Sequence, residues 1–322
     1  MNNNILISSA GRRVELLNYF RAELKSFDKA SKILATDLNP DLSSACQIAD
    51  KSIQICHSQS SDFIDQLLSI CLENKVRLVI PTIDNELLPL AENIEKFRES
   101  GIEIIISEYQ FIKDCRDKRE TRKVFKNLDI DYPEIFDKNN LKFPLFCKPY
   151  DGSSSIGSKI INNESDLTID DLNDPKNIFM ELISSNYIEY TVDGYFTNEG
   201  KLVSLVPRER IEVRSGEVSK GITRKDFLYD FLVKKLNFLP GARGCITFQF
   251  FVDVQNQDIK GLEINPRFGG GYPLTYSAGS NFPKYLINEY LLGESLEFFD
   301  QWDNNLLMLR YDNHVLVDNY DK

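Results

Sequence analysis

Short apolar runs and amphipathic stretches alternate through the first hundred residues. The apolar runs lie at 4–10, 32–37, 77–82 and 102–107, and the stretches with helical spacing at 14–24, 63–75 and 86–99. Strands separated by helices of this length form βαβ units, whose parallel sheet is covered on both faces. Such sheets bind ligands beyond the carboxyl ends of their strands. Those ends carry Arg12, Arg13, Asp37, Asp84, Asn85 and Glu86.

This pattern ends near residue 112, and a highly charged stretch that predicts one helix follows at 114–130. The chain then becomes rich in Ile, Val, Phe and Tyr, which is typical of strands. The expected strands, mostly antiparallel, lie at 143–150, 159–162, 177–183, 187–197, 201–213, 244–254 and 259–266. Further helices are expected at 225–239 and 281–294. With 322 residues the chain is too long for one ordinary domain, and we expect an α/β domain followed by an α+β region.

Composition argues against several classes of protein. The net charge of −11 opposes nucleic-acid binding, because a phosphate backbone demands a basic face. No run of 18 apolar residues predicts a membrane span, and the first ten residues lack the features of a signal peptide. Six cysteines without a C-x-x-C pair indicate buried thiols in a reducing cytoplasm. With two histidines, His57 and His314, a His-based triad or metal site is not expected.

The segment GLEINPRFGGGY at 261–272 concentrates polar chemistry after an expected strand. Strand alternation puts Glu263 and Asn265 on one face. A hairpin with the preceding strand would bring Gln249 or Asp253 beside them, which makes a cluster of oxygen ligands suited to Mg²⁺. Arg267 offers a fixed fork for a phosphate, and the glycines at 269–271 permit close backbone approach to a ligand. The alternative is a solvated hairpin followed by a glycine turn.

Other candidate elements are weaker when taken alone. In KPYDGSSSIGS at 148–158, Lys148 and the loop amides suit phosphate oxygens, although a flexible hairpin tip is an alternative. The order of lysine and glycines is neither a P-loop nor a dinucleotide fingerprint. Lys118 alone is typical of a solvated helix charge. Glu181 and Glu189 lie at strand edges in a segment that could pass an adenine and a ribose.

The order of these elements resembles the ATP-grasp superfamily, over roughly residues 5–295. The match runs from Lys118 through FCKPYDGSSSIGS and MELI…EYTVDG to Q…EINPR. It is most similar to the branch that contains the carbamoyl phosphate synthetase large subunit and the pyrrolysine-biosynthesis ligase. The resemblance implies a Rossmann-like pre-ATP-grasp domain at 1–112, an ATP-grasp small lobe at 113–182, and a large lobe with the metal site and C-terminal tail at 183–322.

The resemblance also implies roles for individual residues. Lys118 and Lys148 would contact the ATP phosphates, and the loop from Gly152 to Gly157 would close over them. The residues implied in nucleotide binding are Lys118, Lys148, Gly152, Ser153, Ser154, Ser155, Gly157, Glu181, Leu182, Ile183 and Glu189. Of these, Glu181 and Ile183 would frame the adenine and Glu189 would bind the ribose.

Glu263 and Asn265 would hold magnesium ions, and Arg267 would stabilise the transferring phosphoryl group. Gln249 would be a third metal ligand. Many family members have an acidic residue at that position, although the carbamoyl phosphate branch resembles this chain in using glutamine. Asp253 therefore stays open as an alternative ligand. Two Mg²⁺ ions are expected, and Mn²⁺ could substitute.

A basic segment at 206–226 carries Arg208, Arg210, Arg214, Lys220 and Arg224. Period two places Arg208 and Arg210 on the same face, where either could bind a substrate carboxylate. Lys220 or Arg224 would help to neutralise ATP. Arg12 or Arg13 could likewise meet substrate, and the alternative for the basic segment is a solvated hairpin.

We therefore expect a cytoplasmic ATP-dependent carboxylate–amine ligase that acts on small molecules through an acyl phosphate, with a homodimer as a possibility. A catalytically inactive ATP-binding regulator is one alternative, against which the intact Lys148, Glu263 and Arg267 count. A nicotinamide-dependent oxidoreductase is another. The sequence argues against this alternative, because the turn after the first expected strand contains one glycine, Gly11, whereas a dinucleotide-binding turn needs the motif G-x-G-x-x-G.

Overall fold

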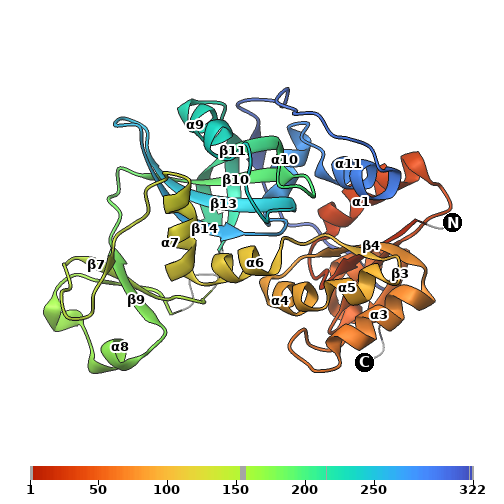
Figure 1. Cartoon of the computed structure of the whole chain (residues 1–322), viewed down its shortest axis with the longest axis horizontal. Coiled ribbons are helices and arrows are strands. Elements are labelled where there is room, and N and C mark those ends of the chain that lie inside the picture. The colour runs from red at the N-terminus through yellow and green to blue at the C-terminus, as the bar shows by residue number, and fades with distance from the viewer. Residues whose placement is uncertain (1–2, 153–156, 215, 319, 321–322) are drawn as a thin grey trace.

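The computed structural model describes residues 3–152, 157–214, 216–318 and 320. In this part of the chain the strands form three sheets. Figure 1 shows an elongated molecule with the N-terminal domain at one end and a smaller sheet at the other. None of the described helices is long and apolar enough to cross a bilayer.

The N-terminal domain is the expected parallel sheet, with strand order β3-β2-β1-β4-β5. Its strands are β1 (Asn4–Ser8), β2 (Ile33–Asp37), β3 (Lys51–Gln54), β4 (Val76–Pro81) and β5 (Glu103–Ile104). One face packs against α1 (Val14–Phe27), α2 (Ser44–Ile48) and α11 (Phe282–Leu286), and the other against α3 (Phe63–Glu73), α4 (Asp84–Glu92) and α5 (Ile94–Arg98). A short 3-10 turn, η1 (Pro40–Leu42), precedes α2. Because both faces are covered, Ile5 and Leu6 of β1 are fully buried.

Two stretches predicted as single helices are each divided in the structure. Residues 86–99 form α4 and α5. Asn93 separates them, as the C-cap residue of α4 and the N-cap residue of α5. The charged stretch forms α6 (Tyr109–Arg116) and α7 (Lys118–Asn127). Asp117 separates them because its side chain accepts a hydrogen bond from the Arg119 amide and caps α7. The break places Lys118 in the first turn of a new helix.

The small sheet follows α7 and has strand order β6-β9-β7-β8. Its strands are β6 (Ile135–Phe136), β7 (Leu145–Pro149), β8 (Lys159–Ile161) and β9 (Asn177–Glu181), all paired antiparallel. A short turn η2 (Glu164–Asp166) and α8 (Ile169–Asn173) connect β8 to β9. This sheet has its own small core around Leu145, Cys147, Ile161 and Phe179.

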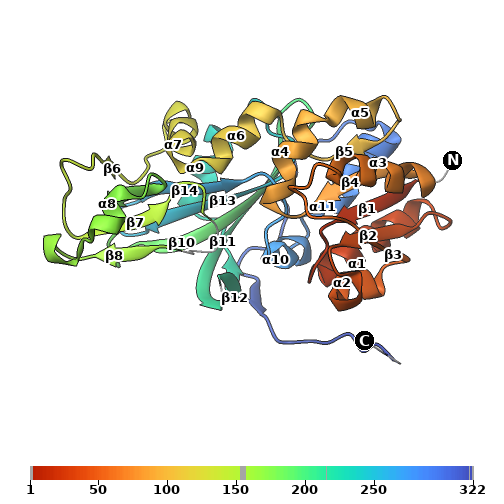
Figure 2. The ribbon, with the colours of Figure 1, turned by 90° about the horizontal axis from the view of Figure 1, so that it is seen from below.

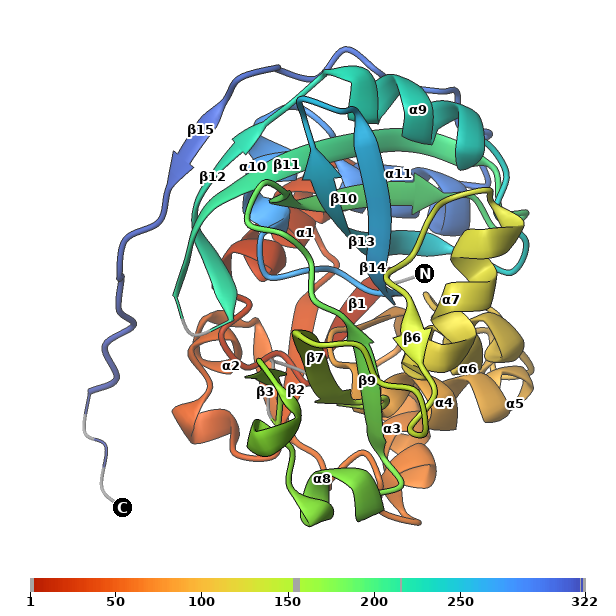
Figure 3. The same ribbon diagram turned by 90° about the vertical axis from the view of Figure 1, so that its left-hand side faces the viewer.

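The large sheet is antiparallel, with strand order β14-β13-β10-β11-β12-β15. Its strands are β10 (Ile188–Phe196), β11 (Leu202–Arg214), β12 (Glu217–Thr223), β13 (Gly244–Asp253), β14 (Asp258–Asn265) and β15 (Leu307–Leu309). After β14 the chain forms α10 (Tyr272–Ser277), α11 and the π-helix η3 (Ile287–Leu292). The tail, in which the sequence predicted no strand, contributes β15 at the sheet edge beside β12 (Figure 3).

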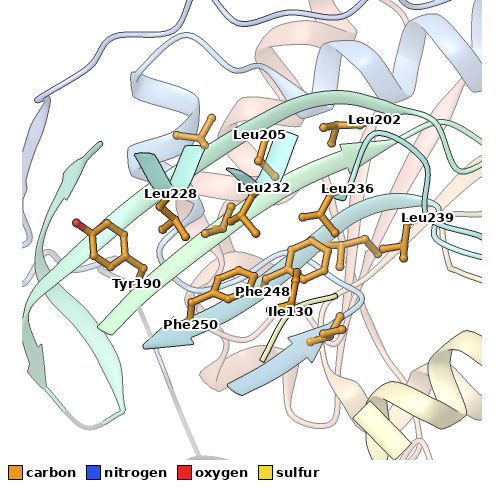
Figure 4. Close-up of a cluster of buried hydrophobic side chains, with 14 of the residues drawn as sticks. Ile130, Tyr190, Leu202, Leu205, Leu228, Leu232, Leu236, Leu239, Phe248 and Phe250 are labelled. Atoms are coloured by element: carbon orange, nitrogen blue, oxygen red, sulfur yellow. The ribbon is translucent and has the colours of Figure 1, made fainter. Parts of the chain in front are cut away.

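One face of the large sheet packs on α9 (Phe227–Lys235) and forms the largest core of the protein (Figure 4). Leu228 and Leu232 of α9 contact the same cluster as Phe248 and Phe250 of β13. Strand alternation sends the residues between these phenylalanines to the other face. That second face looks toward the small sheet and the N-terminal domain, and it carries the candidate site (Figures 2 and 3).

Candidate active site

The hairpin predicted between the last two long strands is present as β13 and β14. Gln249 pairs in register with Glu263, and Thr247 pairs with Asn265. On the neighbouring strand Thr191 pairs with Gln249, which puts Glu189 on this same face two residues away. The register therefore brings Gln249, Glu263 and Asn265, the residues predicted as oxygen ligands, to one face of the sheet.

The alternative ligand Asp253 lies at the tip of this hairpin. Its carboxylate accepts hydrogen bonds from the backbone amides of Gln255 and Asn256, at 3.0 and 3.1 Å, and from Asn256 Nδ2 at 2.7 Å. The bond from the Asn256 side chain, aided by the backbone bonds, lowers the pKa of Asp253. Asp253 thus holds the turn together, and it is not among the described residues that line the cavity below.

A cavity of about 300 Å³ separates the small sheet from this polar face. Its lining includes most of the residues predicted to bind a nucleotide. The described lining residues are Lys118, Pro133, Phe146, Lys148, Pro149, Gly152, Ser158, Ile160, Met180, Glu181, Leu182, Ile183, Ser184, Glu189, Gln249, Phe251, Leu262 and Glu263. Apolar side chains from both sheets and charged groups at one end give the cavity the character of a small-molecule site.

Two lysines and one carboxylate meet at the charged end of the cavity. Lys118 Nζ lies 3.5 Å from a Glu263 carboxylate oxygen and donates a hydrogen bond to the Gly152 carbonyl oxygen. Burial and the nearby charge of Lys118 together lower the pKa of Lys148 to about 8, against the opposing effect of Glu263. Two cations with one carboxylate between them leave an excess of positive charge, which suits an anion such as a polyphosphate.

Two more glutamates line the cavity, each already paired. Both Glu181 oxygens accept hydrogen bonds from Lys260 Nζ, at 2.8 and 2.9 Å. Glu189 lies 3.3 Å from the Arg210 guanidinium. Burial raises the pKa of Glu189, Arg210 opposes that shift and Glu263 adds to it. Lys260 thus neutralises the Glu181 carboxylate, and Leu182 and Ile183 add apolar side chains to the lining.

Arg267, beyond the Glu263 end, contacts the N-terminal domain. Its Nε and one terminal nitrogen donate to the two carboxylate oxygens of Asp84, at 2.9 and 2.6 Å. Asp84 is the first residue of α4, so its carboxylate lies at a helix N-terminus. Burial lowers the pKa of Arg267, but the Asp84 carboxylate outweighs burial and the net shift is upward. Arg267 therefore remains a fixed positive charge next to Asn265.

The structure assigns Arg208 to the protein interior. Its side chain is 2% exposed, and a terminal nitrogen lies 2.8 Å from Asp193, which is fully buried. A Cβ at Gly271 would come within 2.1 Å of the guanidinium, so the glycine turn packs directly on Arg208. The ion pair with Asp193 gives Arg208 a structural role, and its binding of a substrate carboxylate stays a prediction.

Other residues predicted from the sequence fall in different places. Arg210 shares the sheet face with Arg208, as period two predicts, but its nearest carboxylate is Glu189. Lys220 pairs with the exposed Glu212 at 2.7 Å and does not belong to the described lining of the cavity. Gly157, at the far side of the glycine-rich loop, has a positive φ of 74°. Ser153, Ser154 and Ser155 lie outside the described residues.

The oxygen donors on the sheet face fit a magnesium ion by their chemistry. Glu263 provides a carboxylate, and Gln249 and Asn265 provide amide oxygens on neighbouring register positions. The described residues contain no group of three His, Cys, Asp or Glu side chains placed to hold a metal. A magnesium ion here would therefore share its coordination with phosphate oxygens, as Mg²⁺ commonly does.

Sequence reasoning missed several contacts of the predicted residues. Lys260, which neutralises Glu181, is three residues before Glu263 in the same strand, but no pattern links it to residue 181. Asp84 was noted at a strand end without its partner Arg267, which is 183 positions away. Arg310, described below, lies in a tail that carries no recognisable motif. Such pairs depend on tertiary packing, which periodicity does not encode.

Two family models match the chain. The PylC-like N-terminal domain matches residues 5–105, and the model described as ATP-grasp in the biosynthetic pathway with Ter operon matches residues 173–308. The 3-methyl-D-ornithine–L-lysine ligase of Methanosarcina acetivorans is 26% identical over 223 residues, which are 66% of this chain and 57% of that protein. The match thus spans little more than half of that curated relative.

Solved structures share the fold. Biotin carboxylase from Campylobacter jejuni, solved as a β,γ-ATP complex, has a TM-score of 0.72 and 18% identity, covering 95% of this chain and 74% of that one. N5-carboxyaminoimidazole synthetase from Staphylococcus aureus, complexed with ADP, has a TM-score of 0.69 and 19% identity, covering 92% and 80%. The chain is thus similar to PylC-like N-terminal domains over residues 5–105 and to an ATP-grasp family over residues 173–308, and it shares the fold of these solved structures.

Proposed function

We propose that the protein is an ATP-dependent carboxylate–amine ligase that works through an acyl phosphate. One observation carries the proposal: Lys118, Lys148 and Glu263 converge at one end of the cavity between the two sheets. Adenine and ribose would lie at the other end, near 181–183 and Glu189, and the triphosphate would point toward the lysines. The proposal agrees with the ATP-grasp match and with the ligase relative.

In the first step, a carboxylate oxygen of the acid attacks the γ-phosphorus of ATP, and ADP leaves. In the second, the amine attacks the acyl carbon, phosphate leaves, and the amine loses a proton. Lys118 and Lys148 orient and neutralise the phosphates, and Arg267 stabilises the charge on the transferring group. Glu263, Asn265 and Gln249 would hold one or two magnesium ions, which supply further charge neutralisation when bound, and Mn²⁺ could replace them.

The domain boundaries are part of this proposal. Residues 1–112 would form the pre-ATP-grasp domain, 113–182 the small lobe and 183–322 the large lobe. We also propose a cytoplasmic location and a homodimer. The biotin carboxylase domain of Hydrogenobacter thermophilus 2-oxoglutarate carboxylase was solved as a dimer. Light scattering on the purified chain tests the dimer directly.

Hydroxylamine trapping tests the ligase. The protein is incubated with ATP, magnesium, hydroxylamine and a panel of small carboxylic acids, and ADP and hydroxamate are measured. Acid-dependent ADP release with matching hydroxamate is expected, because hydroxylamine intercepts an acyl phosphate. Glu263→Gln serves as the matched inactive control. ATP binding without acid-dependent release would instead favour the inactive ATP-binding regulator. The nicotinamide-dependent alternative is not favoured by any of the matches described above.

A further inference from the structure

A second cavity, of about 630 Å³, lies on the other side of the glycine turn. Three segments contribute most of its described lining: the loop 9–16 leading into α1, the turn 269–273, and the C-terminal segment 308–315. Residues of β11 and β12, with Ser44, Thr82 and Ile83, complete the lining. The ATP-grasp family model ends at residue 308, so the third wall lies beyond the matched region. Figures 2 and 3 show this segment leaving β15 and running toward the N-terminal domain. We call residues 308–315 the C-terminal strap.

Arg13 is a charged residue of the first wall. Within the described part of the chain, its guanidinium donates one hydrogen bond, a long one of 3.5 Å to the Thr82 carbonyl oxygen. Burial and the positive charge of Arg267 together lower the pKa of Arg13 to about 10, against the opposing effects of Glu217 and Asp84. A half-buried cation beside a second cation is stabilised when an anion binds to it. Gly269 and Gly270 of the second wall follow Arg267 directly in the chain, so this cavity adjoins the proposed phosphoryl-transfer end of the first.

Arg310 ties the C-terminal strap to the glycine turn. Its side chain donates to Glu217 at 2.8 Å and to the Gly270 carbonyl oxygen, and its backbone amide donates to Ser219 at 2.9 Å. A Cβ at Gly270 would lie 2.9 Å from the Glu217 carboxyl carbon, so glycine leaves room for that carboxylate. The strap therefore holds the turn that begins two residues after Arg267.

Resting on the proposed function, we propose that this second cavity holds the non-nucleotide substrates and that Arg13 binds the anionic group of an amine that carries a carboxylate or a phosphate. The C-terminal strap completes the cavity, and Arg310 is a positioning residue that determines which amines fit. The cavity is about twice the volume of the nucleotide cavity, so it has room for the acid and a small amine together. Glu217 also lines this cavity, and its carboxylate is already paired with Arg310.

Binding of defined probes tests the proposal on the full chain with Mg-ADP present. The probes are the twenty L-amino acids and O-phosphoethanolamine, and the matched uncharged probes are the amino acid amides and ethanolamine. Calorimetry should find an amine whose anionic form binds and whose capped form does not. Binding by an amino acid or by O-phosphoethanolamine separates a carboxylate from a phosphate ligand. Arg13→Met should lower the affinity for that probe by about tenfold or more, and Arg13→Lys should restore part of the affinity.

Arg310→Met should change the ranking of probes of different size, while the affinity for ADP and the melting temperature stay close to wild type. Arg98→Met, an exposed arginine of α5 paired with Glu95, is the control and should change neither. Equal binding of anionic and capped probes, no binding by any probe, or an unchanged affinity in Arg13→Met would each overturn the proposal. Failure of ADP itself to bind would instead contradict the ligase assignment, and it is measured first.

Discussion

Asp84 of the N-terminal domain holds Arg267 of the large lobe through two charge-assisted hydrogen bonds, at 2.9 and 2.6 Å. Both side chains are largely buried, at 20% and 17% exposure. The arginine proposed to stabilise the phosphoryl group is therefore oriented by another domain. Two hydrogen bonds to one side of a planar guanidinium fix the direction of its remaining N–H groups.

Asp84→Asn should lower kcat of the ligase reaction by about tenfold to a hundredfold, because Arg267 loses the carboxylate that orients it. The KM for ATP should change less, since the lysines that contact the phosphates remain. The free energy of unfolding should fall by about 1–3 kcal/mol, because a buried arginine loses its partner. Steady-state ADP release and urea unfolding measure both effects. Asp65→Asn, at an exposed pair with Lys96, is the control. A mutant with unchanged kcat would show that Arg267 needs no such support.

Lys148 predicts a pH-dependent affinity for nucleotide. Its pKa of about 8 means that the free protein loses this charge as the pH rises through that value. Bound phosphate favours the charged form and raises the pKa, so the affinity falls above pH 8. For one group of pKa 8, ADP binding should weaken about tenfold between pH 7 and pH 9. Calorimetry with EDTA keeps metal out of the measurement. Lys148→Arg stays charged and should flatten the dependence, and an equally steep curve in that variant would assign the titration to another group.

Glu263→Gln should separate metal dependence from nucleotide binding. Turnover should fall by about a hundredfold or more, because a metal ligand and its charge are lost. ADP binding in EDTA should stay equal or strengthen, since a negative charge near the phosphates is removed. Asp253→Asn is the matched comparison, because that residue holds the hairpin turn, and it should leave the magnesium dependence intact. A lost magnesium dependence in Asp253→Asn with a normal one in Glu263→Gln would reverse the ligand assignment.

Arg208→Met should destabilise the protein strongly. The change leaves Asp193 buried without its charged partner, which costs about 3–5 kcal/mol in comparable pairs. Lys220→Met removes an exposed pair with Glu212 and should cost about 1 kcal/mol or less. Chemical denaturation compares the two. If Arg208→Met unfolds no more easily than Lys220→Met, the Arg208–Asp193 contact does not stabilise the interior and the residue regains interest as a substrate ligand.

Local patterns predicted the parts of the fold that are repetitive. Alternation of apolar runs gave the parallel sheet, and period two put Glu263 and Asn265 on one face. The same rule put Arg208 and Arg210 on one face, but it could not say what lay across from them. Asp193 on the neighbouring strand pairs with the buried Arg208, and Glu189 pairs with Arg210.

The division of the charged stretch at Asp117 shows the other limit. One capping hydrogen bond ended a helix that composition would have continued. The tail was harder still, because three residues of β15 pair with an edge strand that lies some ninety positions earlier. Neither the short strand nor the contact of Arg310 with Gly270 has a local signature. The sequence identified the chemical groups of the site, but tertiary packing determined which of these groups contact each other.

Lys118 contacts two parts of the molecule at once, the loop that follows β7 and Glu263 of β14. Its backbone amide donates to the Tyr150 carbonyl oxygen at the end of β7, and its side chain reaches Gly152 on one side and Glu263 on the other. If the small sheet moves away from the large sheet, the contacts that join the two sheets through Lys118 must break. The same ammonium group would therefore bind a phosphate and hold the two sheets together. Release of product and opening of the lobe are then coupled events, and the exchange rate of the Lys118 amide hydrogen would report them.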